Sequence, residues 1–218
     1  LTDSEVMLSG VPAITDVWNM QKTLNELGCV TLWQGDRLVL KSNRQEVIVP
    51  PDHADQLRAS LLCLGPLLAR NGYCHMRLPG GCDIGARPID QTIKGMTTLG
   101  ADVKIERGTL LVTTEGLRGA EVYLDIPSVG ATINTMLTAV SATGNTTIYN
   151  CAKEPHIVDV ANFLNSMGAR IKGAGTDIIR ITGGRPLRGS TYAIIPDQIE
   201  TGTLMIAAAA TGGDVTIT

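Results

Sequence analysis

Apolar positions recur along this chain with two different periods, which predicts amphipathic helices joined to short strands. Within residues 159–168, the apolar residues Val160, Phe163, Leu164 and Met167 recur at helical spacing. This spacing places them on one face of a helix. We expect Asp159 to cap the N-terminus of this helix and Gly168 to end it, because a glycine readily adopts the left-handed conformation there.

Short apolar runs on either side of glycine turns predict hairpins. Residues 170–172 and 178–181 flank a turn that contains Gly173 and Gly175, and two strands joined by a glycine turn are typical of a hairpin. The same pattern occurs around Gly35 and around Gly108. The strands expected there and at the start of the chain are residues 6–8, Trp33, 38–40, 103–105 and 110–112.

Two helix types recur at a nearly fixed spacing. The amphipathic type occupies residues 16–28, 90–100 and 159–168, whose final glycines lie 72 and then 68 residues apart. The second type is apolar on nearly every face, which indicates burial. It occupies residues 58–72, 131–144 and 202–213, with apolar centres at 61–68, 136–140 and 204–210.

The recurrence predicts three repeats of about 70 residues in an α/β (α+β) fold. Three buried helices with sheets outside them imply pseudo-threefold packing around a helical centre. The alternative is an ordinary α/β sandwich with chance similarity between its parts. The first repeat lacks the helix expected before Leu1, and the last one stops after Thr218. We therefore expect a piece of a larger protein.

Composition narrows the function classes. The chain of 218 residues is 44% hydrophobic and 3% aromatic, with Phe163 as its single phenylalanine, so the core must be aliphatic. A net charge of −3 argues against a general nucleic-acid binder. The sequence contains no apolar run of membrane-spanning length and no secretory signal, so we expect no membrane partner.

Five cysteines occur without any CxxC pair, at positions 29, 63, 74, 82 and 151. An odd number of unpaired thiols is typical of a reducing compartment, and we expect a cytoplasmic protein. The wide spacing also argues against a zinc site. We interpret Cys29, Cys63 and Cys151 as small core residues because their neighbours are apolar.

The remaining chemistry is concentrated in a glycine-rich segment at residues 79–90, where Cys82 precedes Arg87 and Pro88 by only a few positions. A nearby cation lowers the pKa of an exposed thiol and favours the reactive thiolate. The alternative is a surface loop that happens to contain a cysteine. Residues 130–132 open a predicted helix, and helix N-termini bind anions. His53, His75 and His156 are interpreted as structural.

Several segments together resemble the enolpyruvyl transferase family, most closely the branch that acts on a UDP-sugar. They are residues 57–72, 78–90, 127–132, 154–177 and 196–203. The segment with Cys82 is the most specific, since the sister branch that makes enolpyruvylshikimate phosphate lacks it. The resemblance implies an inside-out α/β barrel in each of two lobes, with the active site between them.

The resemblance also implies a reaction and its participants. An enolpyruvyl group would move from phosphoenolpyruvate to the 3′-hydroxyl of UDP-N-acetylglucosamine, with release of phosphate, in the first committed step of peptidoglycan synthesis. No cofactor and no metal are implied. Cys82 would act as the general acid, add to phosphoenolpyruvate and be alkylated by fosfomycin. The implied substrate-binding residues are Arg58, Arg87, Pro88, Ile89, Asp90, Gln91, Ile126, Pro127, Ser128 and Val129.

Some positions depart from the family pattern. Ile126 stands where some members have a lysine, so backbone groups at Ser128 and Val129 would have to contact the diphosphate. Arg58, taken alone, would more often be a surface helix residue than a substrate contact. We expect residues 1–196 to form the first lobe and 197–218 to be the opening helix and strand of the second.

The division into lobes predicts low activity for the isolated chain. The isolated chain should show little turnover, because the lysine and asparagine that bind phosphoenolpyruvate and the base of the second lobe fall outside it. The alternative is a non-catalytic fragment that binds nucleotide sugar or self-associates through residues 203–211.

Overall fold

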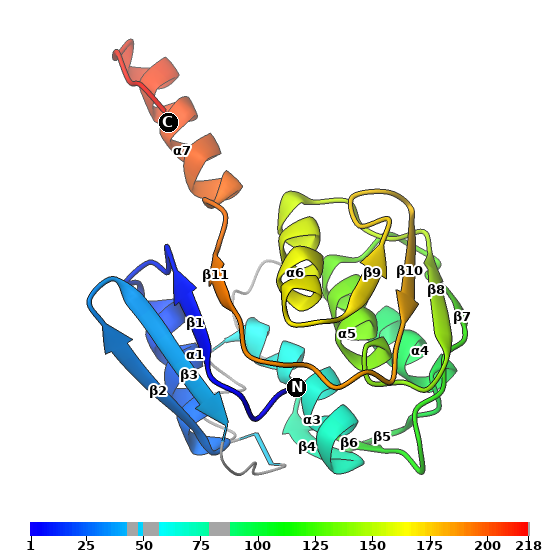
Figure 1. The fold of residues 1–218 in the computed structure, drawn as a ribbon. Helices are drawn as coiled ribbons and strands as arrows, with labels where there is room; N and C mark the ends of the chain where they lie inside the picture. Colours follow the sequence, from blue (N-terminus) through cyan, green and yellow to red (C-terminus); the bar gives the residue numbers. More distant parts are fainter. Residues whose placement is uncertain (43–47, 50–56, 79–87, 218) are drawn as a thin grey trace.

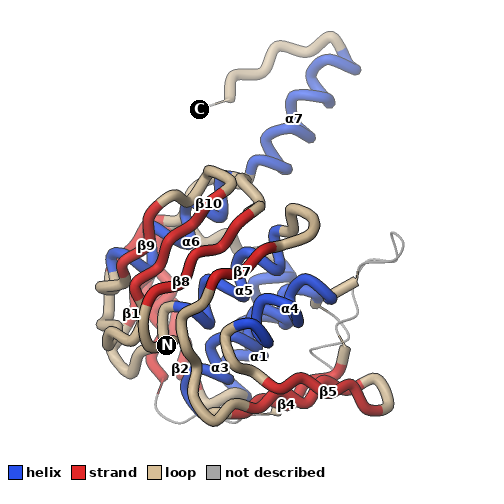
Figure 2. Tube along the Cα trace, turned by 90° about the vertical axis from the view of Figure 1, so that its right-hand side faces the viewer, coloured by secondary structure: helices blue, strands red, loops and turns tan. Residues whose placement is uncertain are grey.

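Helices lie at the centre of the molecule and strands lie around them (Figures 1 and 2). The computed structural model describes residues 1–42, 48–49, 57–78 and 88–217. Within these ranges the strands form two four-stranded sheets and one three-stranded sheet. The resulting fold is a mixed α/β arrangement, as the two periods in the sequence predict.

The first sheet combines the two ends of the main body of the chain. Its order is β11-β1-β3-β2. The strands are β1 (Val6–Ser9), β2 (Cys29–Gln34), β3 (Arg37–Ser42) and β11 (Thr191–Ala193). The hairpin predicted around Gly35 is confirmed, with Trp33 opposite Leu38 in the antiparallel pair β2–β3. Strand β11 pairs in parallel with β1, so residues far apart in the sequence share this sheet.

The other two sheets contain the remaining predicted hairpins. The second has the order β7-β8-β10-β9 and the third β4-β6-β5. The strands are β4 (Tyr73–Arg77), β5 (Asp102–Glu106), β6 (Thr109–Thr113), β7 (Glu121–Tyr123), β8 (Asn145–Tyr149), β9 (Arg170–Lys172) and β10 (Ile178–Thr182). The pairs β5–β6 and β9–β10 are antiparallel, which confirms both predictions.

The helices agree largely with the sequence pattern. They are α1 (Thr15–Glu26), η1 (Arg58–Cys63), α3 (Leu64–Asn71), α4 (Asp90–Thr98), α5 (Val129–Ala139), α6 (Pro155–Ser166) and α7 (Gln198–Thr211). The amphipathic helices α4 and α6 are followed by Gly100 and Gly168, whose φ angles are 98° and 106°. This left-handed conformation favours glycine and confirms the predicted helix ends.

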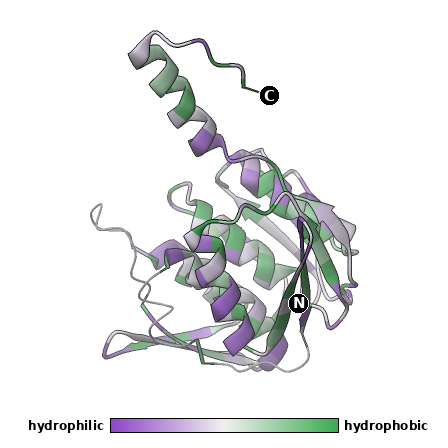
Figure 3. Cartoon of the chain, turned by 90° about the vertical axis from the view of Figure 1, so that its left-hand side faces the viewer, coloured by the Kyte–Doolittle hydropathy of each residue, from purple (hydrophilic) through white to green (hydrophobic). Residues whose placement is uncertain are grey.

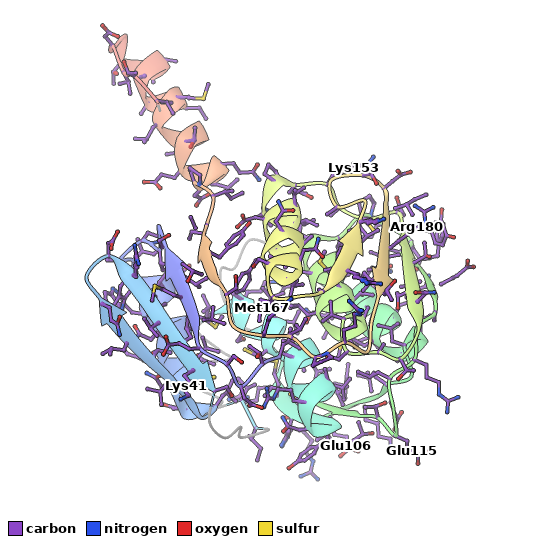
Figure 4. All side chains as sticks on the ribbon, viewed as in Figure 1. Lys41, Glu106, Glu115, Lys153, Met167 and Arg180 are labelled. Atoms are coloured by element: carbon purple, nitrogen blue, oxygen red, sulfur yellow. The ribbon has the colours of Figure 1, made fainter. Side chains whose placement is uncertain are left out.

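The core is aliphatic and has α5 at its centre. Met136 of α5 is fully buried, as are Leu68 of α3 and Leu110 of β6. Phe163 is only partly buried at the edge of this cluster. In Figure 4 the labelled charged side chains of Lys41, Glu106, Glu115, Lys153 and Arg180 lie at the periphery, whereas Met167 lies in the interior.

The prediction that Asp159 caps α6 is wrong. The helix begins at Pro155, with Glu154 at the N-cap position. A proline fits the first turn of a helix because its fixed φ suits that position and its missing N–H has no helical partner there. Asp159 instead accepts a hydrogen bond of 2.7 Å from the Tyr192 hydroxyl, which connects α6 to β11.

The prediction that residues 204–210 form a buried helix is also wrong for this chain. Helix α7 projects away from the body (Figure 1), and none of its residues is buried. Its apolar positions are nevertheless as hydrophobic as those of the interior helices (Figure 3). Residues 213–217 form no strand. Among the helices described here, α7 included, none is long and apolar enough to cross a bilayer.

Candidate functional site

A cavity of about 480 Å³ lies where η1, α4 and α5 begin. Its wall residues come from these three starts and from the segment before α5. They are Arg58, Ala59, Leu61, Leu62, Pro88, Asp90, Gln91, Thr92, Ile126, Pro127, Ser128, Val129, Gly130 and Ile133. The site residues expected from the sequence at 58, 88, 90, 91 and 126–129 therefore line a single cavity.

Among the described residues expected at the site, Ile89 does not belong to this wall. Ile89 is the N-cap residue of α4 and packs against the core instead. Cys82 and Arg87 lie outside the described residues, so their roles stay predictions. The general acid expected from the sequence is thus not part of the geometry described below.

The start of α5 supplies the anion-binding feature of the cavity. Ser128 has an extended backbone at the N-cap position, and its Oγ accepts a hydrogen bond of 3.4 Å from the Ala131 amide. The first amides of a helix have no partner within the helix and carry the positive end of its dipole. A Cβ added at Gly130 would meet no atom within 4 Å, so the helix start has open space in front of it. This arrangement suits a phosphate group.

Arg58 supplies the positive charge described at the cavity wall. It is the first residue of η1, a 3-10 helix that continues into α3. Arg58 is half-buried and is one of the residues that line the cavity, so its role in substrate binding stays a prediction. A guanidinium is always charged near neutral pH and can bind two phosphate oxygens at once.

The start of α4 is attached to the segment before α5 by hydrogen bonds. Gln91 donates from Nε2 to Asp90 Oδ2 at 2.9 Å and to Asp125 Oδ2 at 3.1 Å. Its Oε1 accepts a bond of 2.8 Å from the Asp125 amide. Lys94 Nζ contacts Asp125 Oδ1 at 2.5 Å. The hydrogen bond from Lys94, followed by that from Gln91, lowers the pKa of the Asp125 carboxyl group.

Sequence reasoning missed several wall residues, although helical periodicity could have found them. Ile133 lies one turn after Val129, and Leu61 and Leu62 lie one turn after Arg58. Side chains at these spacings share a helix face. The hydrogen bonds between Gln91 and Asp125 gave no such signal, because they join residues 34 positions apart.

Three of the described thiols have environments unlike that of a nucleophile. Cys63, Cys74 and Cys151 are buried. Desolvation raises the pKa of Cys63 and of Cys74 to about 12 and that of Cys151 to about 11. Cys63 and Cys151 are the core residues that the sequence predicts, whereas Cys29 is only half-buried. Across the ranges that the structure describes, no three His, Cys, Asp or Glu side chains are grouped as metal ligands.

The whole chain, residues 1–218, matches the EPSP synthase (3-phosphoshikimate 1-carboxyvinyltransferase) family. It is 52% identical to a UDP-N-acetylglucosamine 1-carboxyvinyltransferase of Clostridium botulinum over 96% of this chain and 51% of that protein. It is 50% identical to UDP-N-acetylglucosamine 1-carboxyvinyltransferase 2 of Carboxydothermus hydrogenoformans over 100% of this chain and 52% of that protein. The chain spans about half the length of the curated relatives it matches.

Solved structures show the same fold. The enolpyruvyl transferase NikO from Streptomyces tendae is similar with a TM-score of 0.82 and 21% identity, over 95% of this chain and 50% of that one. An EPSP synthase from Acinetobacter baumannii is similar with a TM-score of 0.73 and 18% identity, over 96% and 48% of the two chains.

Proposed function

Because the chain belongs to the EPSP synthase (3-phosphoshikimate 1-carboxyvinyltransferase) family, we propose that it forms part of an enolpyruvyl transferase acting on UDP-N-acetylglucosamine. The enzyme would transfer enolpyruvyl from phosphoenolpyruvate to the 3′-hydroxyl of the sugar and release phosphate. One observation carries this proposal: wall residues from three separate segments form one cavity with a cation and a helix N-terminus. Relatives about 50% identical bear the name of this activity.

The cavity chemistry suits the nucleotide-sugar substrate. Its diphosphate is an anion, which the first amides of α5 and the Arg58 guanidinium could bind together. Ile126 is 56% exposed and cannot contribute a charge, so the amides after Ser128 would make the diphosphate contacts. Apolar wall residues such as Leu61 and Leu62 suit the uracil ring and exclude water.

The proposed mechanism requires an acid at the methylene carbon of phosphoenolpyruvate. Protonation of C3 develops positive charge at C2, where the sugar hydroxyl adds while its proton passes to a base. Loss of a proton from C3 of this adduct then re-forms the double bond and expels phosphate. We assign the proton donor to the Cys82 thiol and phosphate binding to Arg87. No cofactor or metal would take part.

The architecture behind this function is also part of the proposal. The orders α3-β4-α4-β5-β6 and α5-β8-α6-β9-β10 are the same, which supports the three-repeat interpretation. We infer that residues 1–196 form one inside-out α/β barrel lobe and that 197–218 open a second. The enzyme would act in the cytoplasm, in peptidoglycan synthesis.

The alternative is a non-catalytic chain that binds nucleotide sugar or self-associates through residues 203–211. The exposure of α7 is the observation in its favour. The names of the relatives favour the enzyme. Phosphate release from phosphoenolpyruvate and UDP-N-acetylglucosamine by the natural polypeptide would contradict the alternative, and size-exclusion chromatography with mass detection shows whether the chain self-associates.

Labelling with fosfomycin tests the proposed function. We expect one adduct at Cys82, formed faster when UDP-N-acetylglucosamine is present, and phosphate release from the natural polypeptide that carries this chain. The buried Cys63, Cys74 and Cys151 serve as internal controls, because thiols with pKa values of about 11 to 12 are at most ~0.1% thiolate at pH 8. Equal labelling of all five thiols would contradict the role of Cys82. Turnover of shikimate 3-phosphate in place of the UDP-sugar would contradict the substrate assignment.

A further inference from the structure

The buried side chain of Gln91 connects the two sides of the cavity to each other. Gln91 belongs to the first turn of α4, and Asp125 immediately precedes residues 126–129 on the other side. The Gln91 amide group donates to the Asp125 carboxylate at 3.1 Å and accepts from the Asp125 backbone amide at 2.8 Å. This reciprocal pair fixes the position of one segment relative to the other.

The hydrogen-bonding groups of Gln91 are mostly used within the protein, which leaves one acceptor position on its amide oxygen. A glutamine amide has two N–H donors, and here they are directed to Asp90 and Asp125. Its oxygen already accepts the Asp125 amide. The side chain is also only 6% exposed. Gln91 therefore lines the cavity with little of its amide left to bind the substrate.

Lys94 holds the carboxylate of Asp125, the hydrogen-bond partner of Gln91. It lies one turn after Gln91 on α4 and forms an ion pair with the second oxygen of the Asp125 carboxylate. Each oxygen of that carboxylate is thus bound from α4. The Lys94 and Asp125 side chains are 39% and 60% exposed, so solvent screens this ion pair.

We propose that Gln91 is a positioning residue that holds residues 126–129 against α4 and so sets the affinity of the cavity for the nucleotide sugar. The inference rests on the proposed function and gives Gln91 a role different from the substrate contact expected from the sequence. Binding is sensitive to this distance because Arg58 and the α5 amides must reach the same diphosphate from different segments. Phosphoenolpyruvate binding should depend on it much less.

The test uses the natural polypeptide and four variants. Gln91→Met keeps the length of the side chain and removes the hydrogen bonds. Gln91→Glu places a carboxylate beside the carboxylates of Asp90 and Asp125, and Gln91→Glu/Asp125→Asn restores a donor opposite that new acceptor. Asp102→Asn is the control, because it breaks an exposed ion pair with Lys104 on β5, outside the cavity wall.

We expect Gln91→Met to raise the dissociation constant and the KM for UDP-N-acetylglucosamine about tenfold, with kcat and the KM for phosphoenolpyruvate changed less than about twofold. Gln91→Glu should have a larger effect, and the double variant should recover much of it. Asp102→Asn should match the wild type. The inference is overturned if the wild type binds the nucleotide sugar and Gln91→Met binds it equally well, or if both KM values rise together.

Failure of the proposed function gives a different result. In that case the wild type itself would neither bind UDP-N-acetylglucosamine in a calorimetric titration nor release phosphate. Thermal unfolding of each variant shows whether weaker binding comes from a less stable fold or from a displacement of residues 126–129 relative to α4. A Gln91→Met protein that melts with the wild type but binds nucleotide sugar weakly supports the positioning role.

Discussion

Two apolar helices of this chain have opposite surroundings. Helix α5 has eight buried residues, whereas α7 has none. Both consist mainly of alanine, threonine and aliphatic residues. Helix α5 packs against α3, α4 and α6, while α7 extends from the body of the molecule (Figure 2). A helix that is apolar on all faces is therefore expected to be buried, but its sequence does not show which segment packs against it.

The cover over α5 depends on close approach between helices. A Cβ added at Gly95 of α4 would collide with the Thr135 side chain of α5. A Cβ added at Gly202 of α7 would meet nothing within 4 Å. Small residues at helix contacts allow backbones to approach and raise the packing density. The two glycines therefore have different meanings although both occur inside helices.

The largest expected effect comes from removing a methionine side chain from each helix. Met136 of α5 is fully buried and Met205 of α7 is 58% exposed. Because a buried methionine leaves a cavity, we expect Met136→Ala to lower the free energy of unfolding by about 2–5 kcal/mol. Met205→Ala should change it by less than about 0.5 kcal/mol. Urea denaturation of residues 1–218 measures both.

Equal losses in the two variants would break the comparison. Such a result would mean that α7 is covered in solution, and sedimentation of the same sample would then show whether a second copy provides the cover. If only Met136→Ala lowers the free energy of unfolding, the contrast between a buried α5 and an exposed α7 stands.

Local structure was largely predictable from the sequence, whereas its assembly was not. The turns at Gly35 and Gly108 and the helix end at Gly168 depend on residues a few positions apart, and all three predictions are confirmed. The cap assigned to Asp159 is wrong because Pro155 moved the helix start and Tyr192, 33 residues away, binds the carboxylate. Long-range partners of this kind leave no local pattern.

The candidate site follows the same division. The resemblance supplied residues such as Arg58 and Ser128, and the structure brings them to one cavity. The connection between Gln91 and Asp125 was not predictable, since neither residue type nor spacing signals a contact across 34 positions. The sequence therefore predicted the residues that line the cavity better than the hydrogen bonds that hold those residues in place.

A second pair of substitutions should give effects of opposite sign. Gly95→Ala forces α4 away from Thr135, and overpacking of this kind costs about 1–3 kcal/mol of unfolding free energy. Gly202→Ala relieves the conformational cost of glycine in a helix and should stabilise α7 locally by about 0.5–1 kcal/mol. Denaturant unfolding reports the first, and amide hydrogen exchange within α7 reports the second. Stabilisation by Gly95→Ala would contradict the close α4–α5 packing.

The smallest effects should come from the helix caps. Ser128 caps α5 and Asp197 caps α7, where its Oδ1 accepts from the Ile199 amide at 2.8 Å. Each replacement by alanine removes one N-terminal hydrogen bond, which is worth about 1 kcal/mol. Ser128→Ala should lower the stability of the whole molecule, because α5 can unfold only with the core around it.

Asp197→Ala should leave that global stability unchanged and speed hydrogen exchange in the first turn of α7 alone. The shorter hydrogen bond, at Asp197, would therefore have the smaller global consequence, since the effect of a cap depends on what its helix supports. If Asp197→Ala lowered the global unfolding free energy as much as Ser128→Ala, α7 would have to unfold together with the core, and the contrast between the two helices would be lost.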